Sequence, residues 1–158
     1  MRNGDDESAN AGGGIEAIHM PEGRDREALT AVGGAAPAFT LAFMRTCPDC
    51  VELVNTAGRL TFMNENGRSA MGIDAFDRLR GTDWADLWPV ESRPLIHHAL
   101  DRALSGEAVR ITAARLTMAG ETKTWDVTVS PVVNAAGDVE SILSLARDVT
   151  PARASQGR

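Results

Sequence analysis

The sequence predicts an α+β fold in which one antiparallel sheet carries helices on one face. Runs rich in β-branched and aromatic residues lie at residues 51–63 and 108–149, and short helical patterns fill the stretch between them. Turns that contain glycine separate neighbouring strands in both β-rich regions. No strand-helix-strand alternation runs through the chain, so a doubly wound parallel sheet is not expected.

Composition and charge restrict the class of protein. The 158 residues allow one domain with tails, and a hydrophobic fraction of 43% is enough for a core. The net charge of −6 argues against binding to nucleic acid or to anionic lipid. No apolar run approaches the length of a membrane span, and the N-terminus lacks the hydrophobic core of a signal peptide. We therefore expect a cytoplasmic protein that binds neither nucleic acid nor membrane.

The first 46 residues divide into a tail and a helical segment. Residues 1–22 are rich in glycine and polar residues and are expected to be disordered. Residues 23–46 contain a short helix at 25–32, two glycines, and a second helix that starts at Pro37. The second helix is apolar around most of its circumference, so it needs a partner, either the sheet or a second chain. Its candidate dimer-interface residues are Phe39, Leu41, Phe43 and Met44.

A hairpin and several short helices are expected next. The hairpin pairs residues 51–54 with residues 60–63, and Asn64 is placed to cap the helix that follows. Two further short helices are expected before Pro89. The longest helix is expected to start after the N-cap candidate Ser92 and to end near Gly106.

The last third of the chain predicts three strands, at residues 108–117, 122–133 and 139–149. In the middle strand Trp125, Val127 and Val129 alternate with polar residues, which is typical of a half-buried antiparallel strand. Pro131 indicates a bulge or an edge near the end of that strand.

Cys47 and Cys50 form the tetrapeptide CPDC, whose spacing occurs in redox sites and in halves of metal sites. A zinc site needs two further ligands, and the chain has no second cysteine pair, so no metal site is expected. A thioredoxin-like pair follows a strand and opens a helix, whereas here a strand follows the pair. Ordinary thiols are favoured, with a redox switch as the alternative.

Three stretches together resemble a PAS domain over about residues 47–150. They read CPDCVELVNTAGRLTFMN, GTDWADLWP with the long helix behind it, and TWDVTVSPVVNAAGDVESILSLARDVT. The resemblance implies a five-stranded antiparallel sheet with helices on one face and a pocket between the two layers. It also implies roles in sensing and in dimerisation. The chain ends its last strand with the Asp-hydrophobic-Thr pattern at which many PAS domains pass on their signal, so Asp148 and Thr150 are signal-output candidates, and residues 151–158 form a tail.

The cofactors of this family can be compared with the residues present. Its flavin-binding light sensors carry a reactive cysteine in the helical region after the hairpin, and this chain has no cysteine beyond Cys50. A covalent flavin adduct is therefore not expected, whereas non-covalent flavin stays open. Haem-binding members use a histidine on the long helix. Of the adjacent His97 and His98, His97 lies nearer the apolar stripe and is the haem-ligand candidate.

Aromatic and apolar residues from the helices and the sheet are expected to meet between the two layers. They either line a ligand pocket or pack as a plain core. The pocket candidates are Met63, Trp84, Leu87, Trp88, His97, Leu100, Trp125 and Val127.

No catalytic triad, phosphate-binding glycine loop or metal-ligand cluster stands out, so no enzymatic activity is expected. The favoured hypothesis is a homodimeric sensory module that binds a small molecule and controls a partner such as a two-component kinase or a transcription regulator. The first alternative is a ligand-free interaction domain, and the second is a redox switch at Cys47 and Cys50.

Overall fold

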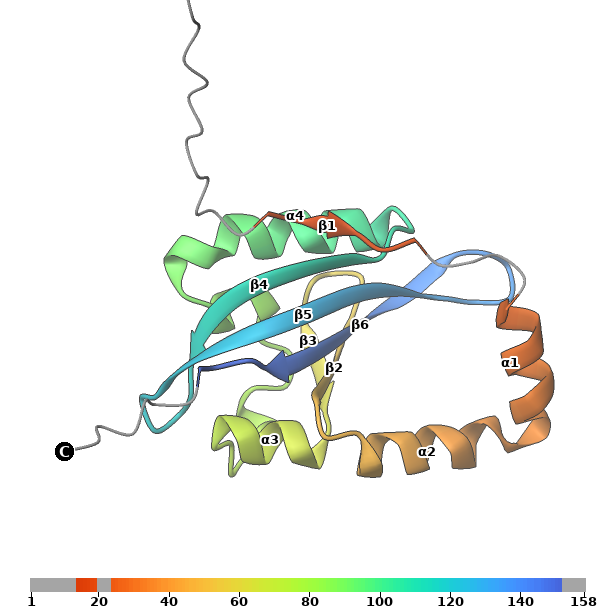
Figure 1. Cartoon of the computed structure of the whole chain (residues 1–158), viewed down its shortest axis with the longest axis horizontal. Coiled ribbons are helices and arrows are strands. Elements are labelled where there is room, and N and C mark those ends of the chain that lie inside the picture. Colours follow the sequence, from red (N-terminus) through yellow and green to blue (C-terminus); the bar gives the residue numbers. More distant parts are fainter. Residues whose placement is uncertain (1–13, 20–23, 152–158) are drawn as a thin grey trace, which may run out of the picture.

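A computed structural model of the chain describes residues 14–19 and 24–151. Their strands form one antiparallel sheet of six strands in the order β1-β4-β5-β6-β2-β3 (Figure 1), which confirms the predicted fold class. The strands are β1 Glu16–Ala17, β2 Cys50–Val54, β3 Leu60–Met63, β4 Val109–Leu116, β5 Thr122–Val133 and β6 Val139–Asp148.

The sheet has one strand more than the five expected, because the chain before the helical segment is partly ordered. In β1, Glu16 and Ala17 pair with Arg110 and Val109 of β4, and the backbone N–H of Ile18 donates to the carbonyl of Ala108. Backbone hydrogen bonds do not depend on apolar side chains, so composition alone does not reveal such a strand. The remaining parts of the expected tail, residues 1–13 and 20–22, lie outside the described residues.

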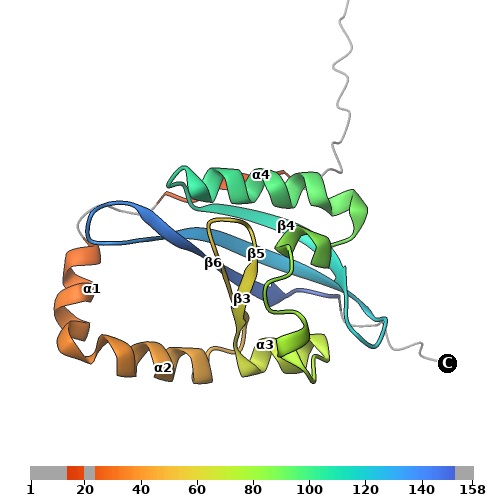
Figure 2. The same ribbon diagram turned by 180° about the vertical axis from the view of Figure 1, so that it is seen from behind.

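Helices and short 3₁₀ turns cover one face of the sheet (Figure 2). The longest is α4, which packs against β4, β5 and β6. The covering elements are α3 Glu65–Met71, η2 Phe76–Arg78, η3 Trp84–Leu87, η4 Val90–Ser92 and α4 Arg93–Leu104. The 3₁₀ turns match the short, interrupted helical patterns of the sequence.

The two predicted helix caps differ in outcome. Asn64 caps α3 as expected, since its side chain accepts a hydrogen bond from the backbone N–H of Gly67 at 3.0 Å. Ser92 makes no side-chain cap, because η4 leads directly into α4 and the backbone at Ser92 is already helical.

Before the domain, α1 Arg24–Val32, the 3₁₀ turn η1 Gly33–Ala35 and α2 Ala36–Thr46 follow one another. Residues Asp25–Thr46 are apolar and long enough by composition to pass for a membrane span, contrary to the sequence-based expectation. However, α1 and α2 run in different directions (Figure 1). At 1.5 Å per residue each is shorter than the ~30 Å of a bilayer core, so in this bent form neither spans one.

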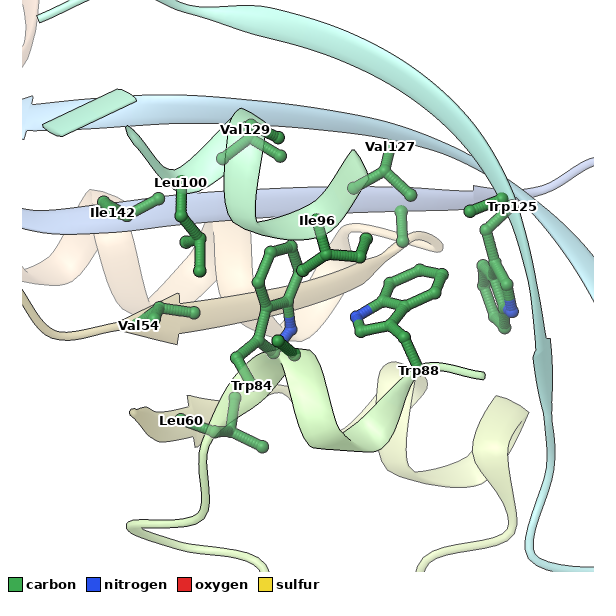
Figure 3. Packing of buried hydrophobic residues seen from close by; sticks show 14 of the residues in the cluster. Val54, Leu60, Trp84, Trp88, Ile96, Leu100, Trp125, Val127, Val129 and Ile142 are labelled. Carbon is green, nitrogen blue, oxygen red and sulfur yellow. The ribbon is translucent and has the colours of Figure 1, made fainter. Parts of the chain in front are cut away.

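The core lies between the sheet and its helical cover (Figure 3). The inward residues of β5 are Trp125, Val127 and Val129, as their alternation predicted. Ile96 and Leu100 of α4 close over them. The register of β5 and β6 shifts between Val132 and Val133, close to the bulge expected at Pro131.

Candidate ligand-binding core

Two tryptophans enter the core from a single turn of 3₁₀ helix. The turn begins at Asp83, whose carboxylate accepts a hydrogen bond from the backbone N–H of Ala85 at 3.1 Å. This cap fixes Trp84 and Trp88 in the core, where their rings meet edge to face with centroids 5.8 Å apart (Figure 3). Trp125 enters from β5 and is equally buried.

Most of the predicted pocket residues do meet between the layers. Leu87 is half-buried against the core, and the fully buried ones are Met63, Trp84, Trp88, Leu100, Trp125 and Val127.

His97 is the exception, and its assignment as a haem ligand is corrected by the structure. Ile96 takes the buried position on α4, and one residue further along the helix turns the side chain by about 100°, away from the core. His97 is exposed, and so are His98 and His19, so the described residues offer no buried histidine to haem. They also contain no group of three or more metal-binding side chains.

A buried ion pair that the sequence analysis missed lies at the centre of the core. Glu52 of β2 and Arg115 of β4 are 0% and 2% exposed. Nη1 of Arg115 lies 3.6 Å from Oε2 of Glu52, which is too long for a hydrogen bond. The same Oε2 accepts a hydrogen bond from Nε1 of Trp84 at 3.3 Å. The Arg115 guanidinium also stacks on the Trp88 ring, 4.7 Å from its centroid.

The alternation of inward and outward residues along each strand indicates that both members of this pair are buried. Glu52 lies between Cys50 and Val54 on the face of β2 that enters the core, and Arg115 continues the inward series of β4 after Ile111 and Ala113. Charged residues are rarely buried, so composition argues for the opposite placement. For these two residues the strand alternation predicts burial correctly, whereas the general preference of charged residues for the surface does not.

Several buried polar atoms of the core, including atoms of the pair itself, have no hydrogen-bond partner among the described residues. Ser144 is the β6 residue in register with Glu52, which places its hydroxyl beside the pair. Leaving such buried groups unpaired costs about 1–3 kcal/mol each. The atoms are Oε1 of Glu52, Nε and Nη1 of Arg115, Nε1 of Trp88, Nε1 of Trp125 and Oγ of Ser144. This donor-rich set is suited to hydrogen-bond a small polar molecule.

The cysteine pair next to this cluster consists of free thiols. Burial, and then the charge of Glu52, raise the pKa of the Cys50 thiol far above its ordinary value. A thiol held protonated is a poor nucleophile and a poor metal ligand. The environment of Cys50 therefore disfavours the redox switch.

Two asparagines attach α2 to the domain. The Asn64 side chain accepts hydrogen bonds from the backbone N–H groups of Val51 and Gly67, and it donates to the carbonyls of Met44 and Asp49. Asn66 donates to the carbonyl of Cys47 at 2.7 Å. The last turn of α2 is thus tied to the start of α3.

The output candidates Asp148 and Thr150 lie at the other end of α3. Oδ1 of Asp148 accepts hydrogen bonds from the backbone N–H and the hydroxyl of Thr150, and the Thr150 hydroxyl oxygen accepts one from the N–H of Thr124. Lys123 lies 3.5 Å from Asp148 and donates to the carbonyl of Ala70 near the end of α3. Burial raises the pKa of Asp148, but the Thr150 hydrogen bonds and the Lys123 charge outweigh it and hold the pKa below its usual value.

The dimer-interface candidates lie on α2, away from the core. Phe39, Leu41 and Phe43 are 57%, 51% and 37% exposed, and Met44 is half-buried. Phe39 and Phe43 are four residues apart and share one side of α2, so they form an exposed apolar surface of the kind that mediates association, whereas Leu41 lies on the other side.

Comparison with known families now decides the class of this domain. The sequence profile of the PAS fold matches residues 45–154, most of the chain and nearly all of the sheet and its cover. The chain belongs to the PAS fold family. The match starts two residues before the predicted domain and ends four residues after it. A comparison with curated proteins finds no significant match.

Solved structures share this PAS fold at low sequence identity. An RNA-binding light-oxygen-voltage receptor has a TM-score of 0.69 at 18% identity; the match covers 88% of this chain but only 39% of the receptor. A PAS domain from Colwellia psychrerythraea has a TM-score of 0.64 at 14% identity, covering 73% of this chain and 98% of that domain. A domain of a sensory box sensor histidine kinase/response regulator from Geobacter sulfurreducens has a TM-score of 0.60 at 23% identity, covering 72% and 94%.

Proposed function

We propose that this PAS domain is a cytoplasmic sensory module that binds a small molecule between its sheet and its helical cover. The observation that carries the proposal is the group of buried polar atoms at and near Glu52 and Arg115 that lack partners in the part of the chain that the structure describes. A core evolved only for packing would be expected to satisfy such atoms or to replace them with apolar ones.

The two ends of α3 offer a route from the core to both terminal segments. At its start Asn64 holds the last turn of α2 and the backbone of β2 next to Glu52. At its end the carbonyl of Ala70 is held by Lys123, which also contacts Asp148. A ligand that moves α3 therefore shifts the packing of both terminal segments together.

Self-association is the proposed output at the N-terminal side. The exposed apolar residues of α2 are placed for contact with the same helix of a second chain, and the partner that reads the dimer is a signalling protein of the histidine-kinase or transcription-regulator type. Support for that partner class comes from the similar domain of a sensor histidine kinase/response regulator.

Native mass spectrometry of the purified full chain tests ligand binding. We expect a mass increment that remains under gentle ionisation and disappears after denaturation. An absorption spectrum of the same sample identifies a non-covalent flavin. A bare mass together with a colourless spectrum contradicts small-molecule sensing.

Sedimentation velocity tests the dimer. Replacing Phe39 and Phe43 together with aspartate is expected to convert a dimer to a monomer, because the carboxylates would be buried in the interface. The matched control replaces two apolar residues of the domain that are more exposed than the two phenylalanines, Val90 and Met118, with aspartate. A ligand-free interaction domain remains the alternative if the dimer forms but no ligand is found.

A further inference from the structure

The buried pair at the centre of the core has spare hydrogen-bonding capacity on both sides. Within residues 14–19 and 24–151, Oε1 of Glu52 accepts no hydrogen bond, and Nε and Nη1 of Arg115 donate none. Each group is nevertheless withdrawn from water almost completely. Buried charges are normally hydrogen-bonded as well as paired, because pairing alone does not repay their lost hydration.

The charge of the pair restricts what can complete it. Glu52 and Arg115 together carry no formal net charge, so a bound anion or cation would add a buried charge without a counterion. A ligand of zero net charge avoids that cost. It must present a donor to the free oxygen of Glu52 and an acceptor to the free N–H groups of Arg115.

Two neighbouring side chains also have unused hydrogen-bonding capacity. Nε1 of Trp88 is another unused donor, and the hydroxyl of Ser144, across from Glu52 on β6, can donate or accept. The rings of Trp84 and Trp88 occupy much of the space beside the pair, so the ligand must be small.

The helical cover over this cluster consists of short turns where the tryptophans enter. η2, η3 and η4 are each only three or four residues long, and Trp84 and Trp88 belong to this region. Segments with few internal hydrogen bonds open at lower free energy than long helices do. A small molecule that reaches the pair would therefore enter most easily through this part of the cover.

From these observations we infer that Glu52 and Arg115 form the recognition centre for a small ligand of zero net charge that carries a hydrogen-bond donor beside an acceptor. Two sources share this chemistry, a zwitterionic α-amino acid and a carboxamide. In each, the N–H donor meets Glu52 and the carboxylate or carbonyl oxygen meets Arg115. The inference rests on the proposed function, since it names the ligand class of the same site.

Thermal denaturation of the full chain with defined probes tests the inference. The probes are glycine and L-alanine for the amino acids, and acetamide and propionamide for the carboxamides. Acetate and methylammonium are the controls, because each offers only one of the two functions. We expect one probe pair to raise the melting temperature by on the order of 5 °C at about 100 times its Kd, and the controls to have no effect.

Two variants test whether a thermal shift with the probes depends on Glu52 and Arg115. Replacing both residues, Glu52→Met with Arg115→Met, removes the recognition groups and leaves no unpaired charge, so the variant is expected to fold. It should lose the response to the probes. The matched control is Arg110→Met, which removes an arginine from the same strand but from the opposite face of the sheet, and which should keep the full response.

Three results would overturn the inference. One is the absence of a shift with all four paired probes, which leaves the pair a structural one hydrated by water only. Another is an equal shift with acetate or methylammonium. The third is a response that survives in the double variant. A co-purifying ligand bound equally by wild type and double variant would refute this recognition centre and still uphold sensing, whereas a protein that carries no ligand and responds to none of the probes contradicts both proposals.

Discussion

The two faces of the sheet each carry an arginine of β4 paired with an acid, and the pairs differ in an unexpected direction. On the outer face Nε of Arg110 donates to Oδ1 of Asp126 at 2.7 Å, and the arginine side chain is 53% exposed. On the inner face Arg115 and Glu52 are fully buried, yet their closest atoms are 3.6 Å apart. The pair that has most to gain from good geometry has the poorer geometry.

The outer face shows what completed pairing looks like. Arg147 donates to Asp49 at 3.3 Å beside the Arg110–Asp126 pair, so opposite charges follow one another across the strands. These residues border an open hollow of about 550 Å³ that also contacts β1. Because its charged groups already satisfy one another or meet water, the hollow has less to offer a ligand than the buried pair does.

Breaking the inner pair should have the largest effect. Arg115→Met leaves Glu52 buried without its counterion, and we expect a loss of about 3–5 kcal/mol in the free energy of unfolding. In melting temperature this corresponds to on the order of 10 °C. Urea denaturation followed by circular dichroism measures it. A loss no larger than that of Arg110→Met would mean that Glu52 gains little from its partner.

Removing both inner charges should change the free energy of unfolding less than removing Arg115 alone does. The double variant with methionine at 52 and 115 has no buried charge, and replacements of this kind are often neutral or stabilising by about 1–4 kcal/mol. We expect it to recover most of the stability lost by Arg115→Met alone. The same denaturation experiment provides the double-mutant cycle. With Glu52→Met as the other single variant, a double variant whose loss equals the sum of the two single losses would show that the two residues act independently.

Sequence patterns predicted most of the fold because its strands obey a simple period. The bounds of β5 agree with the predicted 122–133, and Trp84, Trp88 and Trp125 are buried as expected. Gly67 illustrates a constraint that needs the structure: a Cβ there would lie 2.6 Å from Sγ of Cys50, so only glycine lets α3 approach β2 this closely.

The candidate site was predicted only in its apolar part. Glu52 and Arg115 are more than 60 residues apart in the sequence, and no local pattern indicates that a charged residue finds its counterion inside a core. The prediction for His97 was wrong for a local reason, since the residue after the buried Ile96 is turned about 100° around the helix and faces outward. The sequence predicts that the sheet and its helical cover pack together. Which polar side chains then pair inside the core depends on how the strands align in the folded sheet.

Breaking the outer pair should change stability far less. Arg110→Met removes an exposed partner of Asp126, and water takes over the freed lone pairs of the carboxylate. We expect Arg110→Met to lower the melting temperature by only a small fraction of the shift that Arg115→Met causes. High salt should reduce this small loss further. An effect comparable with that of the inner pair would abolish the distinction between the two faces.

The smallest effect, and the most diagnostic of an exposed pair, is its dependence on pH. The hydrogen bond from Arg110, helped by its charge, holds the pKa of Asp126 below the ordinary value and outweighs burial. A carboxyl whose pKa is lowered by folding stabilises the native state above its unfolded pKa, and this contribution disappears as the pH falls through the folded value. The stability difference between wild type and Arg110→Met should thus be constant near neutral pH, decrease once the pH falls below about 4, and disappear below the folded pKa of Asp126. Glu107 and Asp148, whose pKa values are also lowered, are present in both proteins and cancel in the difference. Melting curves at matched ionic strength from pH 7 to pH 3 measure the difference, and one that grows in acid would contradict the assignment of this pair.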